Sequence, residues 1–265
     1  MLRTSNKKQY LATILYLFLG CILLVFFVFP IYWLIVTSLK MPGDVTAYPV
    51  IWIPKRVTFD NFRLLFGYQG PLWGQTEYVG RSFLPSLVPY LINSLVIGVI
   101  SSGVGILLGS FLSYGMVRFE FGGGRMYNWL LSLRMIPPVV IAIPLFNIFR
   151  NIRLIDTWWS VSVAHLLISI PFSTLLLVGF FNDIPKSITE AALLDGCSNM
   201  KAFFKIAIPL VAPGLVAAFI IAFLTSWNEL LIANILTTTA RAQTLPVYTS
   251  SFSQVERGTA CGPAA

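Results

Sequence analysis

Long apolar stretches separated by short polar segments dominate this chain. Residues 11–36, 83–117 and 206–228 contain no charged side chain, and residues 126–149 and 157–181 are nearly as apolar. About 20 apolar residues suffice for a helix to span the hydrocarbon core of a bilayer. The runs are long and lack strict alternation, which favours helices over barrel strands. The pattern therefore predicts five membrane-spanning helices, at about residues 11–36, 87–117, 126–149, 158–181 and 209–236.

The composition supports a membrane protein. Hydrophobic residues make up 57% of the 265 residues and charged residues only 11%, whereas soluble proteins have about 25% charged residues. The net charge of +8 is explained by basic residues at the ends of membrane helices, so we expect membrane lipid as a partner and no nucleic acid. Cys21, Cys197 and Cys261 lie too far apart for a metal or disulfide pattern. We expect a single all-α transmembrane domain over residues 1–265, with no catalytic or metal site.

The basic N-terminus suggests an orientation. Arg3, Lys7 and Lys8 precede the first apolar run, which is too long for a cleaved signal peptide and ends without an A-x-A site. Basic residues beside the first span favour the cytoplasmic side. The N-terminus and the loop 182–209 are therefore predicted inside, and the loop 37–86 outside, as an ordered segment of turns and short helices.

Small residues recur along the second predicted span. Ser101, Gly105, Gly109 and Ser113 are spaced four residues apart, so they form one ridge on a helix. Such ridges let two membrane helices approach closely. We interpret this ridge as a packing surface between helices.

Prolines mark the third predicted span. Pro137, Pro138 and Pro144 each lack a backbone N–H and disturb a helix. The carbonyl groups freed in this way must face protein or a water-filled cavity. Either a translocation pathway or a kinked packing helix is consistent with this pattern.

Three polar residues interrupt the apolar runs. Arg134 lies near a helix end and can extend its side chain towards the membrane surface. His165 is expected to hydrogen-bond between helices. Glu229, in the run Ser226-Trp227-Asn228-Glu229, is expected to face a pathway or a subunit interface, because a carboxylate inside a membrane is costly. The alternative for Glu229 is a position in the headgroup layer.

The loop at residues 182–209 has the pattern of two short helices joined by a turn. Ser187 and Glu190 fit a capping box at the start of the first helix, although Asp183 could cap it instead. Gly196 supplies the left-handed position that ends it, and Ser198 can cap the second. On physical grounds alone this element could also lie on lipid as an interfacial helix.

The same loop carries a family resemblance. Glu190-Ala191-Ala192, Asp195-Gly196, Phe203-Phe204 and Ile208-Pro209, within EAALLDGCSNMKAFFKIAIPL, resemble the EAA loop of ABC importer permeases. Further matches to the carbohydrate branch are found at Pro30, Trp33, 38–40, Trp52, Pro54, 58–62, Asn93-Ser94, Ile136-Pro137-Pro138, Asp156-Thr157 and 226–229. The resemblance covers nearly the whole chain and is most similar to the smaller permease subunit of maltose-type importers.

The resemblance implies a multi-pass protein of the bacterial inner membrane with the type I permease fold. Its implied partners are a second permease subunit, two ATPase subunits and an extracytoplasmic solute-binding protein, and its implied substrate is a carbohydrate. The implied ATPase-coupling residues are Glu190, Ala191, Ala192, Asp195, Gly196, Phe203, Phe204 and Pro209. Candidates for the pathway or an interface are Trp227, Asn228, Glu229, Pro137 and Pro138. The chain has no G-x-x-x-x-G-K-[ST] phosphate-binding loop, so ATP and Mg are expected on the ATPase and no cofactor on this chain.

The family also implies a sixth span, which would begin near residues 261–265, where the sequence ends. A different class of protein, a secondary transporter or channel without ATP coupling, would need buried ionisable sites and internal repeats. Glu229 alone gives that alternative little support, and neither it nor a membrane anchor requires an EAA sequence.

The predicted topology can be tested with single cysteines and a membrane-impermeant thiol reagent. A cysteine replacing Lys55 should be labelled in intact cells, and one replacing Lys186 should be labelled only after the membrane is opened. The reverse pattern would refute the orientation.

Overall fold

A computed structural model describes residues 5–68, 72 and 85–251. No strand occurs among these residues, which confirms the all-α class. The helices in chain order are α1 (Ser5–Ser38), α2 (Pro42–Val45), α3 (Asp60–Leu65), α4 (Leu87–Phe119), α5 (Gly123–Arg134), α6 (Pro138–Asn151), α7 (Trp158–Asn182), α8 (Lys186–Leu194), α9 (Asn199–Ala202), the π-helical turn η1 (Phe203–Ala207), α10 (Ile208–Leu210), α11 (Ala212–Trp227) and α12 (Leu231–Leu236).

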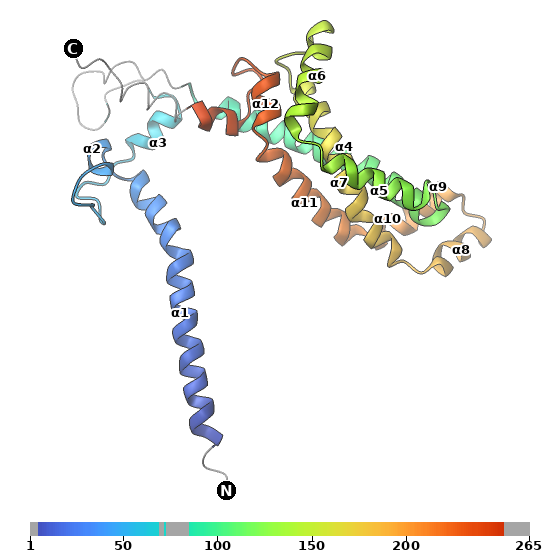
Figure 1. Cartoon of the computed structure of the whole chain (residues 1–265), viewed down its shortest axis with the longest axis horizontal. Coiled ribbons are helices and arrows are strands. Elements are labelled where there is room, and N and C mark those ends of the chain that lie inside the picture. Colours follow the sequence, from blue (N-terminus) through green and yellow to red (C-terminus); the bar gives the residue numbers. More distant parts are fainter. Residues whose placement is uncertain (1–4, 69–71, 73–84, 252–265) are drawn as a thin grey trace. The chain divides into compact units, whose positions relative to one another are not determined.

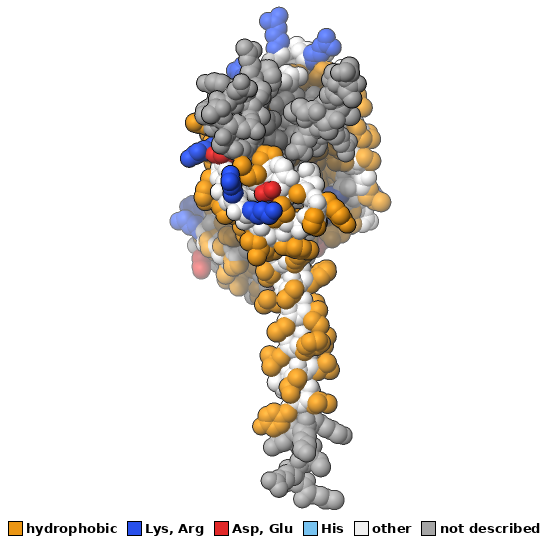
Figure 2. Space-filling view, turned by 90° about the vertical axis from the view of Figure 1, so that its left-hand side faces the viewer, with side chains coloured by type: hydrophobic (Ala, Val, Ile, Leu, Met, Phe, Trp, Pro, Cys, Tyr) orange, Lys and Arg blue, Asp and Glu red, His pale blue; other side chains and the backbone are white. Residues whose placement is uncertain are grey.

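The chain divides into two compact units, Met1–Ser86 and Leu87–Ala265, and each is described by itself. The expectation of a single permease domain stays a prediction. In the first unit, the part of α1 from Gln9 to Ser38 is apolar around its whole circumference, and Figure 2 shows hydrophobic side chains along the face of this helix that is in view. A helix that is hydrophobic on all sides is suited to lipid or to protein partners along its whole length.

The predicted loop 37–86 forms turns and the short helices α2 and α3 over residues 37–68, as predicted, and residues 69–71 and 73–84 lie outside the described residues. The side chain of Lys40 is buried, and its ammonium group lies 4.1 Å from the centre of the Trp33 ring. The side-chain amide of Asn61 donates hydrogen bonds to the carbonyl oxygens of Ser38, at 2.9 Å, and Lys40, at 2.8 Å. These contacts fasten the start of α3 to the end of α1.

The second unit is built on α4, α7 and α11, which pack against one another (Figure 1). The α4–α7 pair makes the most extensive contact. At Gly109, an added Cβ would lie 2.8 Å from the Cβ of Ser173 and 3.0 Å from the backbone nitrogen of Thr174. An added Cβ at Gly105 would overlap Ser169. The ridge of small residues is therefore a packing surface, as predicted.

The third predicted span, residues 126–149, is not one helix. α5 ends at Arg134, α6 begins at Pro138, and the two helices meet at 86°. Pro137 disfavours helical geometry at the preceding residue, and Pro138 occupies the first turn of α6, where a missing N–H has no cost. The prolines therefore break the helix completely, where the sequence predicted a disturbance within a span.

The fifth predicted span, residues 209–236, is also divided. The helical segment Asn199–Leu210 meets α11 at 76°, and α11 ends at Trp227, before α12 begins at Leu231. Three helices of the described chain are long and apolar enough to cross a membrane, or up to five if each bent pair forms one span. Residues 261–265, where a sixth span was expected to begin, lie outside the described residues.

The close α4–α7 contact can be tested with a pair of matched variants. Gly109→Ala should reduce the yield and thermal stability of the purified protein, because the new methyl group meets backbone that cannot move aside. Gly103 lies on the same helix with no atom within 4 Å of an added Cβ, so Gly103→Ala should be neutral or slightly stabilising. Equal stability of the two variants would show that the helices do not pack this closely.

Candidate functional site

The loop at residues 182–209 folds into two short helices joined by a turn, as predicted. α8 ends in a Schellman motif, in which the N–H of Gly196 donates to the carbonyl of Leu193 at 3.1 Å and that of Cys197 to Ala192 at 3.0 Å. Gly196 has a φ of +81°, and Ser198 caps α9 by accepting from the N–H of Lys201 at 3.4 Å. Both features confirm the sequence-based predictions.

The predicted capping box is wrong. Pro185 occupies the N-cap position of α8, no side-chain hydrogen bond caps this end, and Ser187 lies inside the helix. Since proline fixes its own φ near the required value, α8 begins without a side-chain cap.

The coupling candidates divide between an exposed and a buried side of this loop. Glu190, Ala191, Asp195 and Leu194 are exposed, and Leu194 retains 89% of its accessible surface. Ala192 is buried against its own chain. The small side chain of Ala192 therefore allows close packing within this subunit. Of the two alanines, only Ala191 lies on the exposed side, where a partner could approach.

Aromatic residues anchor the second half of the loop. The buried Phe203 ring lies 4.7 Å from the Phe111 ring of α4, 5.0 Å from the Tyr114 ring and 6.3 Å from the Phe181 ring of α7. Phe204 is half exposed and meets Phe111 edge-on. These rings pack the second half of the loop directly against α4 and α7.

Pro209 lies in the short helix α10. The bend of 76° between this segment and α11 follows directly after α10. Pro209 therefore stands at the junction of the loop and the last core helix, close to its predicted place at the start of a span.

The second group of candidates lies where α11 ends. Trp227 is the last residue of α11, and Asn228 and Glu229 follow it in the break before α12. The Glu229 carboxylate accepts hydrogen bonds from the backbone N–H of Ile232, at 2.9 and 3.1 Å, and of Ala233, at 3.3 Å. The first N–H groups of a helix have no partner within that helix, so Glu229 caps α12.

Glu229 also joins a polar network between three helices. One of its oxygens lies 3.4 Å from Nε2 of the buried His165. The Nδ1 atom of His165 is 2.7 Å from the hydroxyl of Ser226, which in turn accepts from the hydroxyl of Ser101 at 3.0 Å. His165 thus bonds between helices, as predicted, and connects α7 with α11 and α4.

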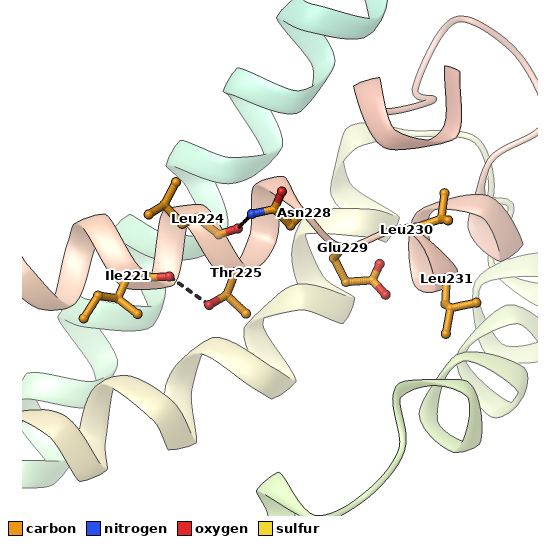
Figure 3. Close-up of a pocket in the computed structure, with 7 residues that line it drawn as sticks. All are labelled: Ile221, Leu224, Thr225, Asn228, Glu229, Leu230 and Leu231. Atoms are coloured by element: carbon orange, nitrogen blue, oxygen red, sulfur yellow. Dashed lines mark hydrogen bonds between the residues drawn. The ribbon is translucent and has the colours of Figure 1, made fainter. Parts of the chain in front are cut away.

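A hollow of about 550 Å³ lies beside the break. It is lined by Ile221, Leu224, Thr225, Asn228, Glu229, Leu230 and Leu231 (Figure 3). A smaller cavity of about 50 Å³ is lined by Arg134, His165, Ile168, Ser169, Phe172, Ala222, Thr225, Ser226 and Glu229. Thr225 and Glu229 line both spaces and therefore stand between them.

The remaining predicted residues lie outside the larger hollow. Pro137 and Pro138 form the turn between α5 and α6 and line neither space. The guanidinium group of Arg134 lies 4.9 Å from the centre of the Phe172 ring in the smaller cavity. Arg134 is an exposed residue that contacts this ring, and the expectation that its side chain extends towards the membrane surface stays a prediction.

Sequence reasoning did not identify a second set of polar contacts, at the start of α7. The side chain of Asn93 donates to the carbonyls of Ala240, at 3.0 Å, and Gln243, at 2.8 Å, and accepts from the indole N–H of Trp158 at 2.7 Å. The hydroxyl of Ser94 accepts from the N–H of Leu245 at 2.7 Å. A polar Asn-Ser pair early in an apolar helix was the available signal.

Asp156 completes this set. It has a φ of +61°, and its carboxylate accepts from the N–H groups of Thr238 and Thr239, at 3.0 and 3.1 Å, and from the Thr239 hydroxyl. Burial alone would raise the pKa of the Asp156 carboxyl, but these hydrogen bonds and the charge of Arg241 outweigh it and hold the pKa below its ordinary value of 3.8. Asp156 therefore fastens the loop before α7 to the segment after α12.

Comparison with known proteins places this chain in a family. Residues 105–263 match the model of the binding-protein-dependent transport system inner membrane component. The chain belongs to this family. The matched region includes both the loop at residues 182–209 and the break after α11. As a member of this inner-membrane transport family, the chain is a multi-pass permease component.

The sequences of relatives in this permease family align with most of the chain. The trehalose transport system permease protein SugB of Mycobacterium tuberculosis (strain CDC 1551 / Oshkosh) is 37% identical over 224 residues, 84% of this chain and 75% of that protein. The sulfoquinovosyl glycerol transport system permease protein SmoH of Agrobacterium fabrum (strain C58 / ATCC 33970) is 32% identical over 227 residues, 85% and 74% of the two chains.

A solved structure of this permease type shares the fold. A chain in the crystal structure of a bacterial ABC transporter involved in the import of the acidic polysaccharide alginate matches with a TM-score of 0.68 and 20% sequence identity. The match covers 95% of this chain and 82% of that chain. At this level of identity the likeness supports the predicted ABC importer permease fold.

The contribution of Asp156 can be tested by its pH dependence. Asparagine tolerates a left-handed backbone, so Asp156→Asn removes the charge without straining the turn, and the purified protein should melt a few degrees lower at neutral pH. Because the folded-state pKa is lowered, the advantage of the wild type is present above the ordinary carboxyl pKa and is lost as the pH falls below it. Asp183→Asn, at an exposed acid at the end of α7, is the matched control and should leave melting unchanged. A difference between wild type and Asp156→Asn that persists undiminished in acid would contradict the role of the charge.

Proposed function

We propose that this chain is the permease subunit of an ATP-driven, binding-protein-dependent importer for a sugar or oligosaccharide. It forms half of the translocation pathway beside a second permease subunit. Two ATPase subunits, which hold ATP and Mg, drive the transport cycle, and an extracytoplasmic binding protein delivers the substrate. Family membership supports the general role, and the named substrates of SugB and SmoH support a carbohydrate.

The observation that carries the proposal is the geometry of the loop at residues 182–209. α8 presents Glu190, Ala191 and Leu194 on an exposed side. An exposed, partly apolar helix at the end of a membrane bundle needs a partner, and a groove on an ATPase subunit supplies one. Phe203 connects this loop to α4 and α7, so force applied at the loop reaches the membrane core.

A secondary transporter or channel without ATP coupling is the alternative. The main support for this alternative was Glu229, an acidic residue within an apolar run of the sequence. The hydrogen bonds that the Glu229 carboxylate accepts from the start of α12, and its position 3.4 Å from His165 Nε2, give this acid a structural role and weaken the support for a transporter without ATP coupling.

Coupling can be tested at Gly196. Valine at a φ of +81° is strained by roughly 1–2 kcal/mol, so Gly196→Val should redirect α9 while the core helices stay intact. In a purified complex in lipid, we expect normal assembly of the two permease subunits. ATP hydrolysis should no longer respond to loaded binding protein, and uptake should be lost.

Gly124→Val is the matched control, because neither glycine has an atom within 4 Å of an added Cβ and only Gly196 has a positive φ. The control should retain coupled hydrolysis and uptake. Wild-type coupling in Gly196→Val would refute the coupling role of this loop.

A further inference from the structure

The polar residues that line the hollow beside the α11–α12 break offer more hydrogen-bond acceptors than donors. Three of its seven lining residues are polar, namely Thr225, Asn228 and Glu229, and none is Lys, Arg or His. The Thr225 hydroxyl donates to the carbonyl of Ile221 at 2.8 Å, and one N–H of Asn228 donates to Leu224 at 2.8 Å (Figure 3). What these residues offer to the hollow is mainly oxygen lone pairs, which accept hydrogen bonds.

The Glu229 carboxylate is held in a fixed position at this wall. The N–H groups of Ile232 and Ala233 and the ring of His165 approach it from within the protein. Arg134, which lines the smaller cavity together with Glu229, lies on the Phe172 ring and does not line the hollow. Preorganised acceptors of this kind bind a ligand without losing further conformational entropy.

The apolar residues of the hollow suit a ligand that has both hydrogen-bond donors and apolar faces. Ile221, Leu224, Leu230 and Leu231 line the rest of the hollow. A neutral sugar has hydroxyl groups that donate hydrogen bonds and C–H faces that pack on aliphatic side chains. A sugar that carries a sulfonate or carboxylate would instead bring a negative charge towards Glu229, and like charges repel each other.

We propose that this subunit contacts the transported sugar directly through Thr225, Asn228 and Glu229, and that this wall favours neutral over anionic sugars. The inference rests on the proposed function as a sugar importer. It assigns to this subunit a share of substrate selection in the membrane, in addition to any selection by the binding protein.

Cysteine protection in the assembled importer tests the contact. Cys21, Cys197 and Cys261 are first replaced by serine, and Asn228→Cys is then introduced into the complex with its ATPase and binding protein in lipid. Two methanethiosulfonate reagents of similar size are used, one cationic and one anionic. The sugar probes are trehalose, which is neutral, and sulfoquinovosyl glycerol, which carries a sulfonate.

We expect the cationic reagent to react with Asn228→Cys about fivefold faster than the anionic reagent, the effect of one nearby charge, and Glu229→Gln to remove this preference. Trehalose supplied with binding protein and ATP should slow the reaction several-fold. Asn234→Cys, at an exposed residue of α12 that does not line the hollow, should react at a rate that neither sugar changes. Glu229→Gln should also raise the uptake of sulfoquinovosyl glycerol relative to trehalose.

The inference is overturned if trehalose is taken up without protecting position 228, or if the thiol there is unreactive because the partner subunit covers the hollow. A faster reaction with the anionic reagent also overturns it. If Asn228→Cys does not assemble, Thr225→Cys, one turn earlier on the same wall, is subject to the same outcomes. A wild-type complex that takes up neither these two sugars nor any other in a panel of mono- and oligosaccharides contradicts the proposed sugar import itself, which separates the two failures.

Discussion

Close packing of α4 against α7 is the contact on which the rest of the second unit depends. Inside a bilayer, helices gain little from the hydrophobic effect when they associate, so they rely on close van der Waals contact and internal hydrogen bonds. Gly105 and Gly109 on α4 meet Ser169 and Ser173 on α7 with no room for a methyl group. The remaining helices of this unit, and both candidate sites, are positioned relative to this pair.

Two polar clusters stabilise the unit near the breaks in its helices. At the α11–α12 break, Glu229 satisfies backbone N–H groups and His165 links three helices. At the other cluster, Asn93 and Asp156 hold the segment that follows α12. Since an unsatisfied buried polar group is costly in a membrane, these side chains allow helices to end inside a folded membrane protein.

The helical class, the second and fourth spans and the turn at Gly196 could be predicted from sequence because each depends on local pattern or local backbone geometry. The third span was predicted as one helix, since hydropathy does not show that Pro137 and Pro138 turn the chain by 86°. The role of Glu229 as a helix cap depended on where α12 begins. The contacts of Asn93 join residues about 150 positions apart, and a single sequence gives no measure of such proximity.

Packing between distant parts of the chain also gives neighbouring residues of the loop different exposure to solvent. Ala191 and Ala192 are the same residue type at neighbouring positions of the EAA sequence, but Ala191 is exposed and Ala192 is buried. This difference follows from the way α8 packs on its own chain. It restricts the surface that α8 offers to any partner to one side of the helix.

The central claim is that the exposed side of α8 contacts an ATPase subunit. A photo-reactive amino acid at Leu194, which is 89% exposed, tests this most directly in the intact complex, with the same group at Trp159, exposed at the start of α7, as control. We predict a cross-link from position 194 to the ATPase and none from position 159. A cross-link from position 194 only to lipid or to the second permease subunit, in a complex that hydrolyses ATP, would contradict the account.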